Sequence, residues 1–147
     1  VIPDCGITTD VIAGFCGETE QDHQDTLTLM EQVVFDSAFM FAYSERPGTL
    51  ASKKYPDDIP YEEKTRRLNE IIALQGRMSL KSNEKEIGKR LKVLVEGPSK
   101  KNPDELCGRA SSNKMCVFPS QGEKPGDYCE VEVVSVTSAT LICRRID

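Results

Sequence analysis

The sequence has no tryptophan and only one histidine, His23, among its 147 residues. A Ser-His-Asp triad or a histidine-based metal site needs partners that a chain with one histidine does not supply. No apolar run approaches the roughly 18 residues of a membrane-spanning helix, so we expect no membrane contact. The chain begins at Val1-Ile2-Pro3, without an initiator methionine or a leader pattern. We therefore expect an internal start point.

Cysteine pairs at metal-ligand spacing are also missing. The six cysteines are Cys5, Cys16, Cys107, Cys116, Cys129 and Cys143, and no two of them form a CxxC motif. The last four lie inside apolar segments, where a free cysteine behaves as a small hydrophobic residue. We predict six free thiols in a cytoplasmic protein, and no complete zinc or iron–sulfur site within this chain.

Charge is distributed unevenly between the two halves. Residues 1–83 contain 8 Lys and Arg against 14 Asp and Glu, a net charge of −6, whereas residues 84–147 contain 11 against 10, a net of +1. Basic residues of the second half cluster at Lys85, Lys89, Arg90, Lys92, Lys100 and Lys101. Such a cluster suits a phosphate backbone. On charge alone, a solvated face is an equally good interpretation.

The first half predicts a βαβ unit. A β-prone run over residues 8–15 ends in glycines, and Thr19 with Asp22 three residues later is a helix start signal. Helical spacing continues to about Val34, and residues 37–43 are typical of a second buried strand. Two parallel strands with one crossover helix leave a face and two edges uncovered. We therefore expect further strands, N-terminal to this sequence, to complete the sheet. His23, among polar residues, is expected to be exposed.

The second half predicts a small barrel. Turn residues fill 44–60, and a connecting helix runs from Pro60 to about Ser82. Five short strand-like segments then follow with glycine, proline and asparagine between them, which is typical of an OB-like barrel. The predicted fold is α/β plus all-β, with a domain boundary between residues 83 and 84. The segments are residues 91–95, 106–109, 114–118, 128–136 and 140–145.

Two strand ends carry candidate site residues. The turn over residues 12–18 holds Gly14 and Gly17 at the end of a buried strand, where backbone can approach a ligand closely. Two turn glycines without a ligand explain the same pattern. Cys16 has no basic partner nearby in sequence, so we do not expect it to be a nucleophile. Arg46, after the second strand, could clamp a carboxylate or phosphate, or could be a surface arginine.

Six segments occur together in an order that is specific to one family. The segments are Thr-Asp-Val-Ile-Ala-Gly-Phe-Cys-Gly-Glu-Thr-Glu (9–20), Phe-Met-Phe-Ala-Tyr-Ser-Glu-Arg-Pro-Gly-Thr (39–49), Arg-Leu-Asn-Glu-Ile-Ile-Ala-Leu-Gln (67–75), Val-Leu-Val-Glu-Gly-Pro-Ser-Lys-Lys (93–101), Gly-Arg-Ala-Ser-Ser-Asn-Lys-Met-Cys-Val-Phe-Pro (108–119) and Ser-Ala-Thr-Leu-Ile (138–142). With them, the sequence resembles the radical-SAM methylthiotransferases, and within them the tRNA-2-methylthio-N6-dimethylallyladenosine synthases.

The resemblance implies a C-terminal fragment of such an enzyme. Residues 1–83 would be the end of a partial radical-SAM (β/α) barrel with a connecting helix, and residues 84–147 a TRAM domain that binds the tRNA anticodon stem-loop. The complete enzyme would use S-adenosylmethionine and two [4Fe-4S] clusters to add a methylthio group to N6-isopentenyladenosine beside the anticodon. Its partners would include the missing N-terminal domains of the same polypeptide.

The resemblance also implies site residues. Ile12, Gly14, Phe15 and Gly17 would bind the cofactor, and Tyr43, Ser44 and Arg46 would face the substrate cavity. The RNA-binding residues would be Lys89, Arg90, Lys92, Lys100, Lys101, Arg109 and Lys114.

The sequence departs from the family at three points. Cys16 and Glu45 stand where family members usually or often carry proline, and the CxxxCxxC cluster motif does not occur. We therefore expect no catalytic or metal-binding residue here, and no activity from the fragment alone. Two alternatives stay open: a sister methylthiotransferase that acts on threonylcarbamoyladenosine in tRNA or on a ribosomal protein, and a non-enzymatic RNA-binding module.

Overall fold

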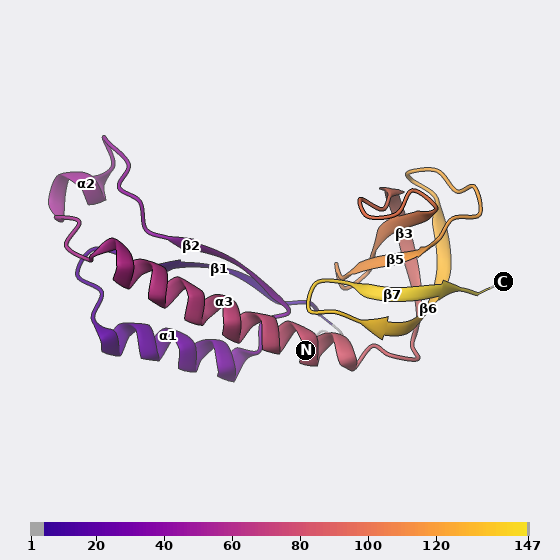
Figure 1. Ribbon diagram of the computed structural model, residues 1–147, viewed down its shortest axis with the longest axis horizontal. Helices are drawn as coiled ribbons and strands as arrows, with labels where there is room; N and C mark the ends of the chain where they lie inside the picture. Colours follow the sequence, from indigo (N-terminus) through magenta and orange to yellow (C-terminus); the bar gives the residue numbers. More distant parts are fainter. Residues whose placement is uncertain (1–4, 147) are drawn as a thin grey trace. The chain divides into compact units, whose positions relative to one another are not determined.

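The computed structural model describes residues 5–146, and the Val1-Ile2-Pro3 start lies outside this range. Residues 7–78 form one compact unit, and a second begins at Ser79, within a helix shared by both (Figure 1). The predicted boundary between residues 83 and 84 stays a prediction. We describe the two units separately as the α/β unit and the barrel unit.

The α/β unit contains the predicted strand–helix–strand sequence. Strands β1 (Thr8–Ala13) and β2 (Ser37–Ala42) pair in parallel, from Thr8 opposite Ser37 to Ala13 opposite Ala42. Helix α1 (Glu20–Val33) joins them, and the Thr19–Asp22 capping box that the sequence predicts begins it. The box pairs two backbone N–H groups that the helix leaves without partners, which fixes where α1 starts.

Two further helices complete this unit. Helix α2 (Leu50–Lys54) lies within the segment that the sequence predicts as a loop, where the Thr49 hydroxyl accepts a hydrogen bond from the Ser52 amide. A helix of five residues has too few turns to show a periodic apolar stripe, so pattern analysis misses it. Helix α3 (Tyr61–Glu84) confirms the predicted connecting helix.

One face of the two-stranded sheet packs on helices, and the other does not. Met30 of α1 and Ile71 and Leu74 of α3 form a core against Ala13 of β1. On the opposite face, Ile12, Phe39 and Phe41 alternate with the core residues and are 54%, 66% and 55% exposed. The sequence predicts the parallel pairing correctly, but burial occurs on one face only among the described residues.

The barrel unit contains all five predicted strands. They are β3 (Arg90–Pro98), β4 (Glu105–Ala110), β5 (Met115–Pro119), β6 (Tyr128–Val136) and β7 (Leu141–Arg145). They close in the order β3-β4-β5-β7-β6, and β3 pairs with β6 (Figure 1). Inward residues such as Val93, Phe118 and Val131 are at most 1% exposed. The predicted five-stranded barrel is therefore confirmed.

All six cysteines are free, and three of them, Cys116, Cys129 and Cys143, are buried in the barrel core. Their sulfur atoms pack as small apolar groups. Within residues 5–146, no helix combines the length and the apolar character that crossing a membrane requires.

The turn after β1 is shaped by a buried lysine of α3. Gly14 has a φ of +75°, and a Cβ at this position would lie 2.3 Å from Cγ of Lys64. Lys64 is 5% exposed, and its Nζ donates to Asp57 at 2.5 Å and to the Tyr43 carbonyl at 3.4 Å. A buried ammonium needs such partners because desolvation is costly. The missing side chain at Gly14 makes room for the Lys64 stem.

We expect Gly14→Ala to lower the free energy of unfolding by about 2–5 kcal/mol, because backbone strain and overpacking add. Gly17→Ala is the matched control: its φ is +78°, but nothing lies within 4 Å of the added Cβ. It should cost about 1–2 kcal/mol from strain alone. Urea unfolding followed by circular dichroism measures both, and equal losses would contradict the packing role of Lys64.

Candidate functional site

The cofactor turn and the cavity segment that the sequence predicts lie next to each other in the α/β unit. The Tyr43 amide donates to the Ala13 carbonyl at 2.8 Å, so the chain leaving β2 continues alongside the turn that leaves β1. The Phe15 ring packs edge-on against the Tyr43 ring, with 5.0 Å between the ring centroids. The centroid of the Tyr55 ring lies 6.4 Å from that of Phe15. Phe15 keeps 42% of its surface exposed. The result is a partly open aromatic cluster beside a glycine turn.

Backbone groups of the turn are held by carboxylates. The Gly14 amide donates to Glu18 at 3.0 Å, and the Gly17 amide donates to Asp58 at 2.8 Å. A hydrogen bond with the Cys16 side chain raises the pKa of Tyr43. Cys16 therefore lies within the aromatic cluster, next to the phenol group.

A network of charged residues on α3 holds the turn after β1 in place through Glu18. Arg67 is 5% exposed and donates to the Glu18 carboxylate at 2.7 Å and to Glu63 at 3.0 Å. Arg66 donates to Glu63 and also to Glu70. The hydrogen bond from Arg66 is the largest cause that lowers the pKa of Glu63 to about 2. Glu18 thereby links a backbone amide of the turn to a buried guanidinium.

The prediction that His23 is exposed is wrong. His23 is 1% exposed, and its Nε2 lies 2.7 Å from the Glu70 carboxylate on α3. This hydrogen bond is the largest cause that lowers the pKa of Glu70. His23 lies seven residues before the buried Met30, which places both on the face of α1 that α3 covers. That spacing was the signal in the sequence, and the polar neighbours of His23 concealed it.

Three other predicted residues lie near the aromatic cluster in sequence and are exposed. Ile12 belongs to the open face of the sheet, and Ser44 and Arg46 follow β2. The Arg46 carbonyl accepts hydrogen bonds from the Thr49 hydroxyl at 2.8 Å and the Thr49 amide at 3.3 Å. The backbone of Arg46 therefore shapes the entry to α2, and its guanidinium stays available to a ligand.

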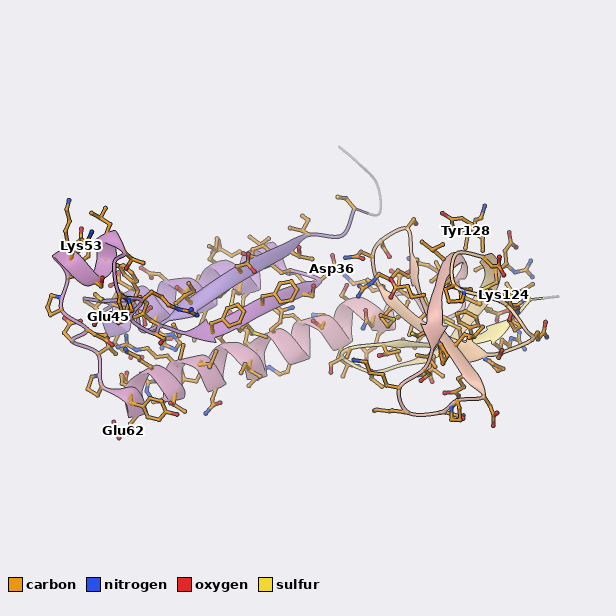
Figure 2. All side chains as sticks on the ribbon, turned by 90° about the horizontal axis from the view of Figure 1, so that it is seen from above. Asp36, Glu45, Lys53, Glu62, Lys124 and Tyr128 are labelled. Atoms are coloured by element: carbon orange, nitrogen blue, oxygen red, sulfur yellow. The ribbon has the colours of Figure 1, made fainter. Side chains whose placement is uncertain are left out.

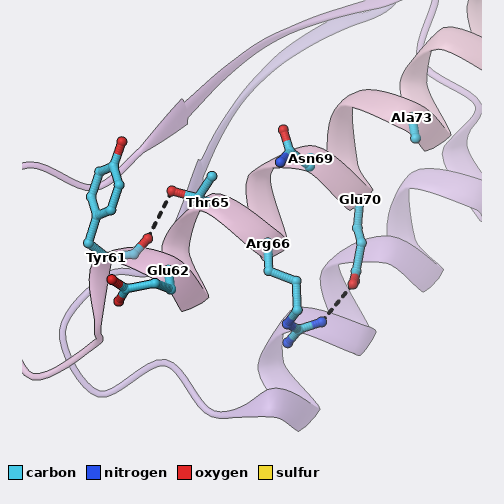
Figure 3. A pocket seen from close by; sticks show the side chains of 7 residues that line it. All are labelled: Tyr61, Glu62, Thr65, Arg66, Asn69, Glu70 and Ala73. Atoms are coloured by element: carbon cyan, nitrogen blue, oxygen red, sulfur yellow. Dashed lines mark hydrogen bonds and ion pairs between the residues drawn. The ribbon is translucent and has the colours of Figure 1, made fainter.

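An open groove of about 680 Å³ lies along α3, and no pattern in the sequence indicates it (Figure 3). Within it the Thr65 hydroxyl donates to the Tyr61 carbonyl, and Arg66 pairs with Glu70. Several polar groups of the groove are therefore already bound to other residues of α3. Its lining residues are Tyr61, Glu62, Thr65, Arg66, Asn69, Glu70 and Ala73.

In the barrel unit, the predicted basic residues separate into different environments. Arg90 and Lys92 lie on the outward face of β3, where their register partners on β6 are Glu132 and Glu130. Lys89 pairs with Glu86 at 3.1 Å. The acidic register partners reduce the positive potential that a count of basic residues along β3 suggests.

Two loops at one end of the barrel add exposed cations. Lys100 and Lys101 lie between β3 and β4, and Lys124 lies between β5 and β6. The Ser120 amide donates to the Asp104 carbonyl at 3.0 Å, which holds these two loops side by side. Figure 2 labels Lys124 and the nearby start of β6, Tyr128. Lys124 is not among the residues predicted from the sequence, because the proximity of the loops arises only from barrel closure.

Lys114 has a structural environment. Its side chain is 10% exposed, and Nζ donates to the Ser82 carbonyl at 3.1 Å and the Ser82 hydroxyl at 3.0 Å. A carboxylate oxygen of Glu86 lies 3.4 Å away. These contacts tie the β4–β5 turn to the end of α3, so Lys114 offers little surface to an RNA.

Metal-ligating side chains do not gather in the part of the chain that the structure describes. No three His, Cys, Asp or Glu residues between 5 and 146 form a group that could hold a metal ion. The residues in this range therefore do not fit an iron–sulfur cluster.

Comparison with known proteins finds matches to the barrel alone and to nearly the whole chain. Residues 84–144 match the TRAM domain. Proteins named tRNA-2-methylthio-N(6)-dimethylallyladenosine synthase match across both units. The one from Phocaeicola vulgatus is 52% identical over 96% of this chain, and the one from Bacteroides thetaiotaomicron is 55% identical over 96%. The one from Amoebophilus asiaticus is 55% identical over 97%.

The matched segment is a limited part of these relatives. This chain spans 31% of the Phocaeicola vulgatus and Bacteroides thetaiotaomicron proteins and 30% of the Amoebophilus asiaticus protein. Among solved structures, the apo form of Mycoplasma genitalium RNase R is 12% identical, with a TM-score of 0.37 over 58% of this chain and 17% of that one. That likeness is too weak to carry an argument. The sequence matches confirm the predicted resemblance: this chain is similar over nearly all its length to one segment of the tRNA-2-methylthio-N(6)-dimethylallyladenosine synthases, and its barrel matches the TRAM domain.

Proposed function

We propose that this chain works as part of a tRNA methylthiotransferase that adds a 2-methylthio group to N6-isopentenyladenosine beside the anticodon. The observation that carries the proposal is 52% identity over 96% of the chain to a synthase of that name. In the proposed division of labour, the barrel unit binds the anticodon stem-loop and the α/β unit forms one wall of the S-adenosylmethionine pocket. The names of the relatives favour an adenosine substrate over the ribosomal protein of the sister hypothesis.

The open face of the α/β unit supports a place within a larger sheet. Phe39 and Phe41 on β2 and Ile12 on β1 expose more than half of their surface. Exposed apolar side chains gathered on one face are typical of a surface that another part of a protein covers. We propose that further strands of a partial radical-SAM (β/α) barrel extend the sheet, with this face turned inward. Such strands would belong to the N-terminal domains of the same polypeptide.

The turn after β1 fits the adenosine part of S-adenosylmethionine. Gly14 and Gly17 give backbone that a ligand can approach, and Phe15 and Tyr43 give aromatic surface at the C-terminal ends of two parallel strands. Bound there, S-adenosylmethionine would supply the radical and methyl-transfer chemistry. The residues of this chain would position its adenine and exclude water. Since residues 5–146 offer no set of cluster ligands, we propose that the chain alone is inactive.

We expect millimolar S-adenosylmethionine to give saturation-transfer NMR signals at its adenine protons in the presence of this chain. Phe15→Ala should remove most of that signal, because the ring is the exposed apolar surface of the turn. Leu29→Ala, at a 55% exposed position on α1, is the control and should leave the signal intact. Equal signals from both variants would contradict the pocket assignment.

The barrel unit supports RNA binding through exposed cations at one end. Lys100, Lys101 and Lys124 form no ion pair within residues 5–146, and Lys92 forms none either. Free cations release condensed counterions when they reach phosphates, which makes affinity fall with salt. The near-neutral charge of residues 84–147, 11 basic against 10 acidic, implies that few such contacts form.

We expect the chain to bind an anticodon stem-loop RNA with an affinity that falls as salt rises. Replacing Lys100 and Lys101 together by alanine should reduce the slope of log affinity against log salt by about 0.7–0.9 for each lost phosphate contact. Fluorescence anisotropy at several salt concentrations measures this slope.

The matched control is Lys53→Ala with Lys54→Ala, which removes two adjacent exposed lysines from α2 in the other unit. This control should keep the slope of the unmodified chain. The assignment of RNA binding to the barrel would be contradicted if the unmodified chain bound no RNA. The same change of slope in both double variants would also contradict it.

A further inference from the structure

Three neighbouring strands of the barrel place unlike side chains in one outward row. Leu94 on β3 lies opposite Arg109 on β4 and opposite Tyr128 on β6. All three alternate with buried residues and therefore point away from the core. Because register partners on one face of a sheet lie about 4.5–5.5 Å apart, the three side chains form a continuous surface. We call Arg109, Leu94 and Tyr128 the outer row.

The outer row is unusual in what it exposes. Tyr128 is 63% exposed and Leu94 is 37% exposed, although both are large apolar residues. Lys92, two residues before Leu94, holds its ammonium 4.7 Å from the Tyr128 ring centroid. It makes this cation–π contact although Glu130 is its register partner. A cation is thus already oriented against the aromatic ring.

Arg109 is held in a fixed plane at the other end of the outer row. Its Nε donates to Glu96 at 3.0 Å, and its NH1 donates to the Asn113 carbonyl at 3.0 Å and to the Asn113 side chain at 3.2 Å. Glu96 offsets much of the charge, so Arg109 is a poor phosphate ligand. A guanidinium fixed in this way still presents a flat face on which a base can stack.

We propose that the outer row is a stacking site for an unpaired nucleobase of the bound RNA. The inference rests on the proposed RNA-binding function and identifies the part of the RNA that this surface takes. The Tyr128 ring stacks on the base, and Leu94 makes an apolar contact beside it. Lys92 binds the adjoining phosphate. Single-stranded loops are recognised in this way because their bases are free to stack on aromatic and arginine planes.

The charge pattern favours a base over a duplex backbone. A duplex is bound mainly through phosphates and the 2′-hydroxyls of its shallow groove, which calls for several free cations in a line. Along this face Glu96, Glu130 and Glu132 alternate with the basic residues. Lys92 is the cation that the outer row directs toward a ligand, so stacking contributes more here than phosphate attraction.

The test measures binding of a fluorescent single-stranded RNA and of a matched blunt RNA duplex to the whole chain. Tyr128→Ala should weaken single-strand binding by about fivefold to 150-fold, the equivalent of one stacked base, and should leave its salt slope unchanged. Tyr128→Phe should restore the affinity, because the ring and not the hydroxyl is used. Duplex binding should be the same for all three proteins.

Tyr61→Ala is the matched control, since Tyr61 is 75% exposed and lies on α3 of the α/β unit. Its single-strand affinity should equal that of the unmodified chain. If the unmodified chain binds RNA and Tyr128→Ala binds equally well, or loses affinity only with a changed salt slope, the stacking site is wrong while RNA binding by the barrel stands. If the unmodified chain binds no RNA, both the proposed function and the stacking site fail.

Discussion

Closure of the barrel between β5 and β7 is the constraint on which the RNA-binding account depends. These two strands pair in parallel over only two register positions, Cys116 with Leu141 and Val117 with Ile142. This short ladder joins β5 to β7 and so closes the ring, which leaves the sheet without exposed edges. Once the ring is closed, Val93 and Val131 fill its interior. The outward residues of β3, β4 and β6 therefore do not contribute to the core.

The α/β unit depends on the opposite arrangement, in which charges are buried rather than excluded. Lys64 and Arg67 of α3 are each 5% exposed. Their carboxylate partners, Asp57 and Glu18, lie in the segments that follow β2 and β1. Removing one partner of such a pair leaves a buried charge uncompensated, which costs about 3–5 kcal/mol. The two pairs therefore hold the strand ends, and with them the aromatic cluster, in one geometry.

Much of this architecture could be predicted from the sequence because its signals are local. The capping box at Thr19 and the five alternating strands depend on residues near one another in the chain, and both occur as predicted. His23 and Lys114 could not be assigned in this way. Each has a polar side chain that a partner far along the chain covers: Glu70 covers the buried His23, and Ser82 binds the partly buried Lys114.

The same limit applies to the candidate sites. The glycine turn and Tyr43 were predicted, and the structure brings them together at the ends of two strands. Tyr128 was not predicted as an RNA ligand, because its meaning depends on lying beside Leu94 in the barrel register. Counting lysines along β3 also overstates its positive charge, since the acidic partners on β6 become neighbours only in the folded sheet.

Binding of RNA to the outward face of the barrel is tested most directly by chemical-shift mapping. The ¹⁵N-labelled chain is titrated with an anticodon stem-loop, and the moved backbone amides are assigned. We predict shifts in residues 92–95, 99–102, 108–110 and 122–129, with the amides of β1 and β2 unmoved. Shifts concentrated in β1, β2 or α3, or none at saturating RNA, would contradict it.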